Sequence, residues 1–194
     1  MLDLIDIYFD YMDKPLLQGI TFQVHSGTIL HLKGDNGAGK TTLLRLLAGF
    51  LQPTQGQIYY KNNLISHNRA AYQQQICYVG HKSGVSPWLT VREHCCYELH
   101  DAISEWPDAF SLKGLEDTPC YLLSAGQRRR LSLMRLLASK ATLWLLDEPL
   151  VGLDKPSVTY LMQLLEQHAR QGGQVVLTSH QALSLSSVCE DYCL

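Results

Sequence analysis

A glycine-rich stretch at residues 34–42, Gly-Asp-Asn-Gly-Ala-Gly-Lys-Thr-Thr, is the feature that most constrains the fold of this chain. It fits the pattern G-x-x-x-x-G-K-(S/T), in which backbone N–H groups surround phosphate oxygens, a lysine adds charge and a hydroxyl reaches Mg²⁺. A β-rich apolar run precedes it at residues 28–33, and residues 41–50 follow with helical spacing. Strand, loop and helix N-terminus together predict a polyphosphate site rather than a glycine turn that binds nothing. The expected phosphate contacts are Gly34, Asn36, Gly37, Ala38, Gly39, Lys40, Thr41 and Thr42.

Length and charge limit the class of protein. The 194 residues suit one domain with a substantial core and room for a subdomain. The 16 basic and 18 acidic residues give a formal charge of −2, which is no electrostatic footprint for nucleic acid. The N-terminal sequence Met-Leu-Asp-Leu-Ile-Asp lacks a secretory signal, and no apolar run approaches the ~20 residues of a membrane span. We therefore expect a cytoplasmic protein that reaches a membrane only through a partner.

The cysteines show neither paired C-x-x-C spacing nor the framework of a small secreted protein. They are expected to be free thiols in a reducing compartment. The group His94, Cys95, Cys96 and His100 is compatible with a soft-metal or haem site, although such side chains on a helix are more often core or surface residues.

The hydrophobic pattern alternates strands with helices. Strands are expected at residues 2–9, 19–25, 28–33, 57–61, 76–80, 142–146 and 174–178, with turns at 11–15 and 53–56. Residues 86–122 are helical in pattern but interrupted by prolines, which predicts a compact helical subdomain between strands. A serine-capped helix is expected to open after Leu123 and to continue to Lys140, and another helix to cover residues 156–170.

Two acidic residues follow the apolar strand at residues 142–146. Asp147 supplies a carboxylate that can hold Mg²⁺ opposite the Thr41 hydroxyl. Glu148 is suited to polarise an attacking water. The alternative interpretation is an Asp-Glu turn without a catalytic role. The phosphate loop upstream argues against this interpretation.

Residues 123–127, Leu-Ser-Ala-Gly-Gln, resemble the L-S-G-G-Q signature of ABC-type ATPases and depart from it only at Ala125. The resemblance covers essentially the whole chain, because the phosphate loop, the Asp-Glu pair, the sequence Val-Gly-Leu-Asp at 151–154 and His180 also match that family. It implies an α/β fold of the P-loop NTPase, ABC type, with a mainly parallel sheet core flanked by helices. It also implies an N-terminal antiparallel β subdomain and an inserted helical subdomain. The single domain would comprise a nucleotide-binding core at 1–84 and 123–194 and a helical subdomain at about 85–122.

The resemblance also implies the cofactors ATP and Mg²⁺ and a head-to-tail dimer, in which the signature of one copy completes the ATP site of the other. Lys40 would hold the β- and γ-phosphates, Thr41 and Asp147 would serve Mg²⁺, and Glu148 would be the catalytic base. Further implied site residues are His180 at the γ-phosphate, Ser124, Gly126 and Gln127 of the signature, Asp154 at the dimer interface, and Tyr11 stacked on adenine. As an aromatic at a strand end, Tyr11 fits a core role as well.

His81 stands where ABC ATPases usually have the glutamine that senses Mg²⁺ and couples to the membrane subunit. A histidine there is able to reach the metal or to accept a hydrogen bond from a water, or it only orients its loop. The segments at 80–84, 114–119, 123–130 and 178–181 are similar to those of the ATP-binding subunit of the bacterial cytochrome c maturation, or haem exporter, system. That resemblance implies an integral membrane permease as partner and a place on the cytoplasmic face of the inner membrane. Haem chemistry itself is not visible in the sequence.

Two other functions remain open at this point. One is the ATPase of another small exporter, against which only the His81 region and residues 116–119 argue. The other is a soluble ABC ATPase that acts on nucleic acid or ribosomes. The single domain and the net charge of −2 argue against that class.

Overall fold

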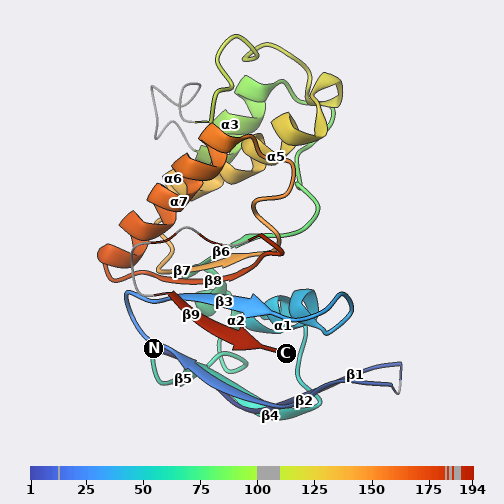
Figure 1. The fold of residues 1–194 in the computed structure, drawn as a ribbon, viewed down its shortest axis with the longest axis vertical. Coiled ribbons are helices and arrows are strands. Elements are labelled where there is room, and N and C mark those ends of the chain that lie inside the picture. The colour runs from blue at the N-terminus through green and yellow to red at the C-terminus, as the bar shows by residue number, and fades with distance from the viewer. Residues whose placement is uncertain (13, 100–109, 182, 184, 186–188) are drawn as a thin grey trace.

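The protein is described by a computed structural model that covers residues 1–194 except 13, 100–109, 182, 184 and 186–188 (Figure 1). Its strands form an antiparallel sheet in the order β2-β1-β4-β5 and a parallel sheet in the order β6-β7-β8-β3-β9. The strands are β1 Leu2–Tyr11, β2 Lys14–Val24, β3 Ile29–Lys33, β4 Gln55–Tyr60, β5 Asn63–Leu64, β6 Ile76–Val79, β7 Leu143–Leu146, β8 Gln174–Thr178 and β9 Cys189–Cys193. This arrangement confirms the predicted α/β class with an antiparallel N-terminal sheet.

The parallel sheet is buried on both faces, as β7 shows. Leu143 and Leu145 pack into the core shared with the antiparallel sheet and α1. Trp144 and Leu146 point the other way, into the core shared with the helices of the opposite face. Because successive side chains of a strand alternate between faces, a continuously apolar strand requires cover on both sides.

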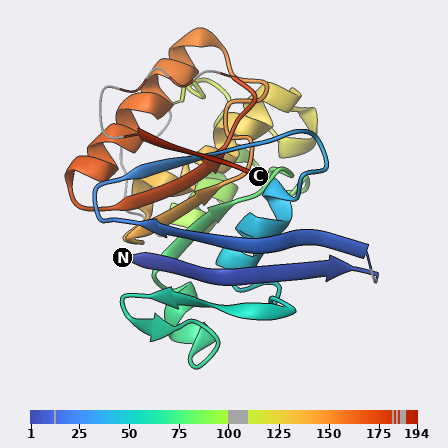
Figure 2. The same cartoon turned by 60° about the horizontal axis from the view of Figure 1, so that its bottom comes forward.

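Helices provide that cover. The helices are α1 Lys40–Leu47, α2 Arg69–Gln73, α3 Val91–Leu99, α5 Ala125–Leu133, α6 Arg135–Ala138 and α7 Lys155–Arg170, with a 3₁₀ turn η1 at Cys120–Leu122. Figure 1 shows α3, α5, α6 and α7 on one side of the parallel sheet and the antiparallel sheet on the other. Figure 2 shows how the long β1–β2 hairpin extends beneath α1. Within the part of the chain described, no helix is long and apolar enough to cross a bilayer.

The structure corrects the predicted strands at several places. β4 begins at Gln55 rather than at residue 57, and β5 was not predicted. β2 begins at Lys14, not at Gly19, so the hairpin turn is shorter than the sequence suggested. The chain also forms β9 after His180, where no strand was expected, and β9 is the edge of the parallel sheet next to β3. Its sequence, Cys-Glu-Asp-Tyr-Cys, lacks apolar alternation because most of its residues are exposed.

The predicted helix to Lys140 is interrupted. α5 ends at Leu133 and α6 begins at Arg135. The Ser132 hydroxyl donates to the Arg129 carbonyl at 2.7 Å, and the Met134 N–H donates to Leu131 O at 3.2 Å. Side-chain to backbone bonds of this kind bend helices, which accounts for the break. In the segment 85–122 the described residues form α3, turns and η1, and residues 100–109 of the predicted helical subdomain lie outside the described residues.

Candidate functional site

The phosphate loop connects β3 to α1. Gly39, the N-cap of α1, has φ 100°, and a Cβ there would lie 2.7 Å from Leu17 Cδ2. Only glycine therefore fits both the backbone and the space at this position. The Lys40 ammonium donates to the carbonyl oxygens of Gly34 at 2.6 Å and Asp35 at 3.0 Å, across the loop. The loop thus presents a lysine and the N-terminus of a helix to one side, as an anion site requires.

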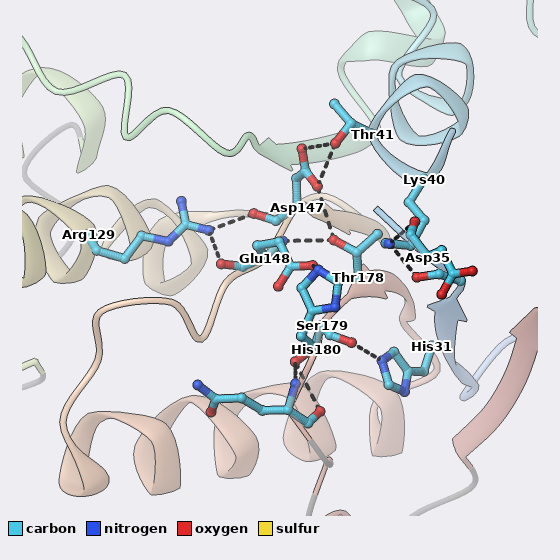
Figure 3. A network of polar contacts seen from close by, with 12 residues as sticks. His31, Asp35, Lys40, Thr41, Arg129, Asp147, Glu148, Thr178, Ser179 and His180 are labelled. Carbon is cyan, nitrogen blue, oxygen red and sulfur yellow. Dashed lines mark hydrogen bonds and ion pairs between the residues drawn. The ribbon is translucent and has the colours of Figure 1, made fainter. Parts of the chain in front are cut away.

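The first residue after β7 joins three elements. The Thr41 hydroxyl of α1 donates to the Asp147 carboxylate at 3.1 and 2.9 Å (Figure 3). Thr178, at the end of β8, donates to Asp147 Oδ1 at 3.0 Å. Asp147 is 1 % exposed, so these bonds compensate the cost of burying its charge. The structure therefore places Thr41 and Asp147 together as predicted, and adds Thr178, which the sequence analysis missed.

Glu148 occupies a strained backbone position beside the cavity described below. Its φ is 50°, in the left-handed region that a non-glycine residue rarely adopts. Its N–H donates to Thr178 Oγ1 at 2.8 Å. Both carboxylate oxygens are buried and have no hydrogen bond, and His180 Nε2 lies 3.5 Å from Oε1 without hydrogen-bond geometry. A buried carboxylate without a donor is poised to accept one from a ligand or water.

Arg129 of α5 holds this backbone in place. Its guanidinium donates to the carbonyl oxygens of Gly80 at 2.8 Å, Asp147 at 2.7 Å and Glu148 at 2.8 Å. Burial lowers the pKa of Arg129, against the opposing charges of Asp147 and Glu148. Arg129 has no role that the sequence predicts, because a cationic helix residue is usually solvent-exposed. Its signal in the sequence is its spacing, since Arg129 lies three and four residues before Ser132 and Leu133. The structure shows that these two residues are buried in α5.

A cavity of about 460 Å³ lies between the phosphate loop and the carboxyl ends of β7 and β8. Its lining comprises Leu16, Asn36, Gly37, Gly39, Lys40, Thr41, Thr42, His81, Asp147, Glu148 and His180. Lys40, Asp147 and His180, which were predicted from distant parts of the chain, thus meet in one cavity. Gly34 and Ala38 belong to the loop but are absent from this lining, and His81 also lines a neighbouring cavity of about 240 Å³ beside α5.

The cavity fits a polyphosphate with Mg²⁺ by its chemistry. Lys40 and the N-terminal N–H groups of α1 complement negative charge. The Thr41 hydroxyl and the Asp147 carboxylate are the hard oxygen ligands that Mg²⁺ prefers. The two orphaned oxygens of Glu148 add an acceptor for water at the same place.

The signature residues lie apart from this cavity. Ser124 caps α5, with its hydroxyl accepting from the Gln127 N–H at 3.2 Å while the Gln127 side chain accepts from the Ser124 N–H at 2.8 Å. A Cβ on Gly126 would lie 2.6 Å from Gly152 O, so α5 and the loop before α7 approach closely there. Asp154 caps α7 and pairs with Arg130 at 3.2 Å. None of the predicted signature residues lines the phosphate cavity of this copy.

Two further predicted groups lie elsewhere. Tyr11 ends β1 at the tip of the hairpin, is 61 % exposed and does not line the phosphate cavity. His94 and Cys95 are buried in α3, where burial lowers the pKa of His94 and raises that of Cys95 to about 12. Among described residues no group of three or more acidic, histidine or cysteine side chains is placed to hold a metal, and His100 lies outside them.

The profile of one protein family, described as ABC transporter, matches residues 17–151. This chain belongs to the ABC transporter family. It is an ATP-hydrolysing ABC ATPase. The matched segment contains the phosphate loop, the signature and both acidic residues of the cavity, so the family match and the geometry concern the same residues.

Curated relatives of this ABC ATPase carry a more specific name. The cytochrome c biogenesis ATP-binding export protein CcmA of Legionella pneumophila (strain Lens) is 51 % identical, over 96 % of this chain and 96 % of the relative. The protein of that name from Yersinia pseudotuberculosis is 42 % identical over 90 % and 84 %, and that from Salmonella typhi is 38 % identical over 94 % and 91 %.

Solved structures share the fold of this ABC ATPase. An ATP-binding subunit of an ABC transporter superposes with a TM-score of 0.83 at 22 % identity, covering 93 % of this chain and 79 % of the other. A dimeric ATP-binding cassette in a post-hydrolysis state, bound to ADP and Pi, has a TM-score of 0.78 at 22 % identity, covering 93 % and 88 %. These likenesses confirm the predicted fold.

Proposed function

We propose that this ABC ATPase powers the export step of cytochrome c biogenesis, in which haem is delivered across the bacterial inner membrane. The observation that carries the proposal is the 51 % identity to the Legionella export protein over 96 % of both chains. Similarity at nearly full length leaves no large segment of either protein without a counterpart. A shared fold alone would not support a particular cargo.

The lining of the cavity supports the following roles for its residues in ATP hydrolysis. Lys40 and the loop amides, Gly34 to Gly39, bind the phosphates, with Thr42 at the start of α1. Thr41 and Asp147 would hold Mg²⁺, which would supply positive charge to offset the negative charge of the phosphates. Tyr11 is proposed to stack on the adenine from the hairpin tip, where its ring is exposed.

Glu148 is proposed as the base that orients and deprotonates the attacking water. Its oxygens are free of donors, and its backbone is fixed at the N–H by Thr178 and at the carbonyl by Arg129. His180, whose Nε2 lies 3.5 Å from Glu148 Oε1, is proposed to contact the γ-phosphate beside that water. Positioning of this kind contributes much of the rate acceleration in phosphoryl transfer.

A second copy of the chain is the proposed partner that completes the site. Ser124 and Gly126 stand at the N-terminus of α5, an anion site that faces no phosphate cavity within its own subunit. Paired head to tail, these residues, with Gln127 and Asp154 near them, would close the ATP site of the other copy. The anion site on α5 supports such a composite arrangement.

The membrane partner is proposed to be an integral permease of the haem-export type, which would hold this subunit at the cytoplasmic face of the inner membrane. His81 lines both the phosphate cavity and the neighbouring cavity beside α5. We infer that His81 couples the nucleotide state to this permease, although the residues lining both cavities belong to the core at 1–84 and 123–194 and not to the helical subdomain at about 85–122. No role for nucleic acid is proposed, since the net charge is −2.

An affinity purification tests the proposal. Tagged Glu148→Gln protein is added with ATP to detergent-solubilised native membranes, and the co-purifying chains and any haem absorbance are identified. We expect a multi-span membrane protein together with components of cytochrome c maturation. Lys40→Ala protein is the control, because it retains the surface but loses phosphate binding.

Other outcomes select between the alternatives. A membrane protein of another transport system would retain the ATPase role and refute the haem assignment. Ribosomes or nucleic acid in the purified material would refute the transport role altogether.

A further inference from the structure

A buried histidine interrupts the apolar pattern of β3, the interior strand next to the edge strand β9. His31 is 4 % exposed and follows Ile29 and Leu30, which pack into the cores on the two faces of the sheet. It lies opposite Leu177 of β8 and Asp191 of β9. A polar ring at such a position is costly unless its nitrogens have partners.

Both ring nitrogens have partners, and these come from different elements. Nε2 lies 3.0 Å from the Ser179 carbonyl oxygen and faces a group that can only accept, as Nδ1 does at the Asp191 carboxylate, so both nitrogens donate, as in the imidazolium form (Figure 3). Nδ1 lies 3.3 Å from Asp191 Oδ1. His31 thus connects the segment after β8 to the edge strand β9.

The Ser179 carbonyl belongs to the peptide bond that leads into His180. The same turn is fixed on its other side, where the Gln181 N–H donates to Ser179 Oγ at 2.9 Å. The backbone of His180 is therefore held from both flanks, by His31 and by the Ser179 hydroxyl. Since His180 Nε2 lies 3.5 Å from Glu148 Oε1, a rotation of this peptide would move the histidine relative to the catalytic carboxylate.

Asp191 is itself fixed in its charged form. Lys33, which leads from β3 into the phosphate loop, donates to Asp191 Oδ2 at 2.7 Å. The Lys33 ammonium, and to a smaller extent His31, hold the pKa of Asp191 below its usual value. The carboxylate is thus available to orient the His31 ring at neutral pH.

We propose that His31 is a positioning residue for ATP hydrolysis, which holds the Ser179 carbonyl so that His180 faces Glu148, and that Asp191 of β9 orients the His31 ring. The inference rests on the role proposed above for His180 but not on the transported substrate. It gives the polar edge strand β9 a function: its carboxylate reaches the catalytic histidine through one buried ring.

A matched pair of substitutions in the full chain tests the role of His31. Glutamine can place an amide N–H near the position of His31 Nε2, and asparagine cannot. We therefore expect His31→Gln to keep kcat within about threefold of the wild-type value. His31→Asn should lower kcat about tenfold, which is the loss expected of one hydrogen bond. KM for ATP should change less than twofold in both, because Lys40 and the loop are untouched. Turnover is measured with radiolabelled ATP, and thermal unfolding shows that each variant is folded.

The double variant with His180→Ala separates positioning from general destabilisation. If His31 acts through His180, His31→Asn should cause no further loss of kcat in the His180→Ala background, whereas independent effects multiply. Multiplied effects, or a wild-type kcat for His31→Asn, would overturn the inference. An unchanged kcat for His180→Ala alone would instead refute the proposed role of His180.

Asp191→Ala keeps the inference testable if His31→Asn does not fold, because the Asp191 side chain is half-exposed. We expect Asp191→Ala to lower kcat at least twofold in the wild-type chain. In the His180→Ala chain, Asp191→Ala should leave kcat unchanged. An unchanged kcat in Asp191→Ala would remove β9 from the proposal. The exposed neighbour Glu190→Gln is the control and should behave as wild type.

Discussion

At the scale of single residues, Glu148 combines burial, backbone strain and the lack of a hydrogen-bond donor to its carboxylate. We predict that Glu148→Gln binds ATP as tightly as the wild type but hydrolyses it about 10²–10⁴-fold more slowly, the usual contribution of a general base. The amide fills the same space, so the phosphate contacts survive. Equilibrium nucleotide binding and single-turnover hydrolysis measure the two quantities, and wild-type turnover would contradict the assignment of the base.

Arg129 is a residue whose importance appears only in the structure. Lysine, as a compact point charge, cannot serve three carbonyl oxygens in the plane of a guanidinium. Arg129→Lys should therefore lower the free energy of unfolding by about 2–3 kcal/mol, because buried carbonyls lose their donors. Urea denaturation measures the change. Arg170 is exposed, so the free energy of unfolding of Arg170→Lys should differ from that of the wild type by less than about 0.5 kcal/mol. An equal loss in both variants would show that the three hydrogen bonds of Arg129 do not stabilise the fold.

At the scale of secondary-structure elements, Asp154 is the N-cap of α7, and its carboxylate accepts the Ser157 N–H at 3.0 Å. The bonds to Ser157, and to a smaller extent Arg130, hold its pKa below the usual value. We predict that Asp154→Ala lowers the free energy of unfolding by about 1 kcal/mol at pH 7.

The pH dependence of this effect has a definite sign. Because the folded-state pKa of Asp154 is depressed, its contribution is present above the unfolded-state pKa of about 3.9 and is lost as the pH falls through the lower folded-state value. The difference between wild type and Asp154→Ala should thus shrink below about pH 4. Asp154→Asn, which can still cap, is the control and should lose less stability at pH 7. Denaturation curves at several pH values measure both variants.

Elements with a strong local signal were predictable from sequence, and elements fixed by tertiary contacts were not. The strand before Asp147 is uniformly apolar, and the serine cap of α5 has its glutamine three residues on, so both were predicted. β9 lacked such a signal, since its place depends on pairing with β3 and on the contact of Tyr192 with Phe22, whose ring centroids are 4.7 Å apart.

At the scale of the whole molecule, the phosphate cavity could be assembled from motifs, but the residues that hold it in shape could not. Lys40, Asp147 and Glu148 follow from short patterns, because each pattern specifies its chemistry. Thr178 and Arg129 act through backbone groups of residues distant in sequence, and no local pattern encodes that geometry. The sequence therefore predicted the residues that line the cavity better than the residues that support them.

The composite site makes a prediction that concerns the dimer. The test uses mixed dimers in which both copies carry Glu148→Gln. Lys40→Ala then disables the phosphate loop of the copy that carries it, and Ser124→Arg blocks the signature of the copy that carries it. If each ATP lies between the loop of one copy and the signature of the other, dimers with the two changes on different copies retain one intact site. Dimers with both changes on one copy retain none.

We therefore expect one occluded ATP per dimer in the first arrangement and none in the second. Differently tagged copies, purified through both tags, supply the two kinds of dimer, and retained radiolabelled nucleotide counts the sites. Equal occlusion in the two arrangements would mean that Ser124 does not act across the interface. Because both dimers contain the same set of substitutions, general destabilisation cannot produce the expected difference, so the experiment isolates the geometry of pairing.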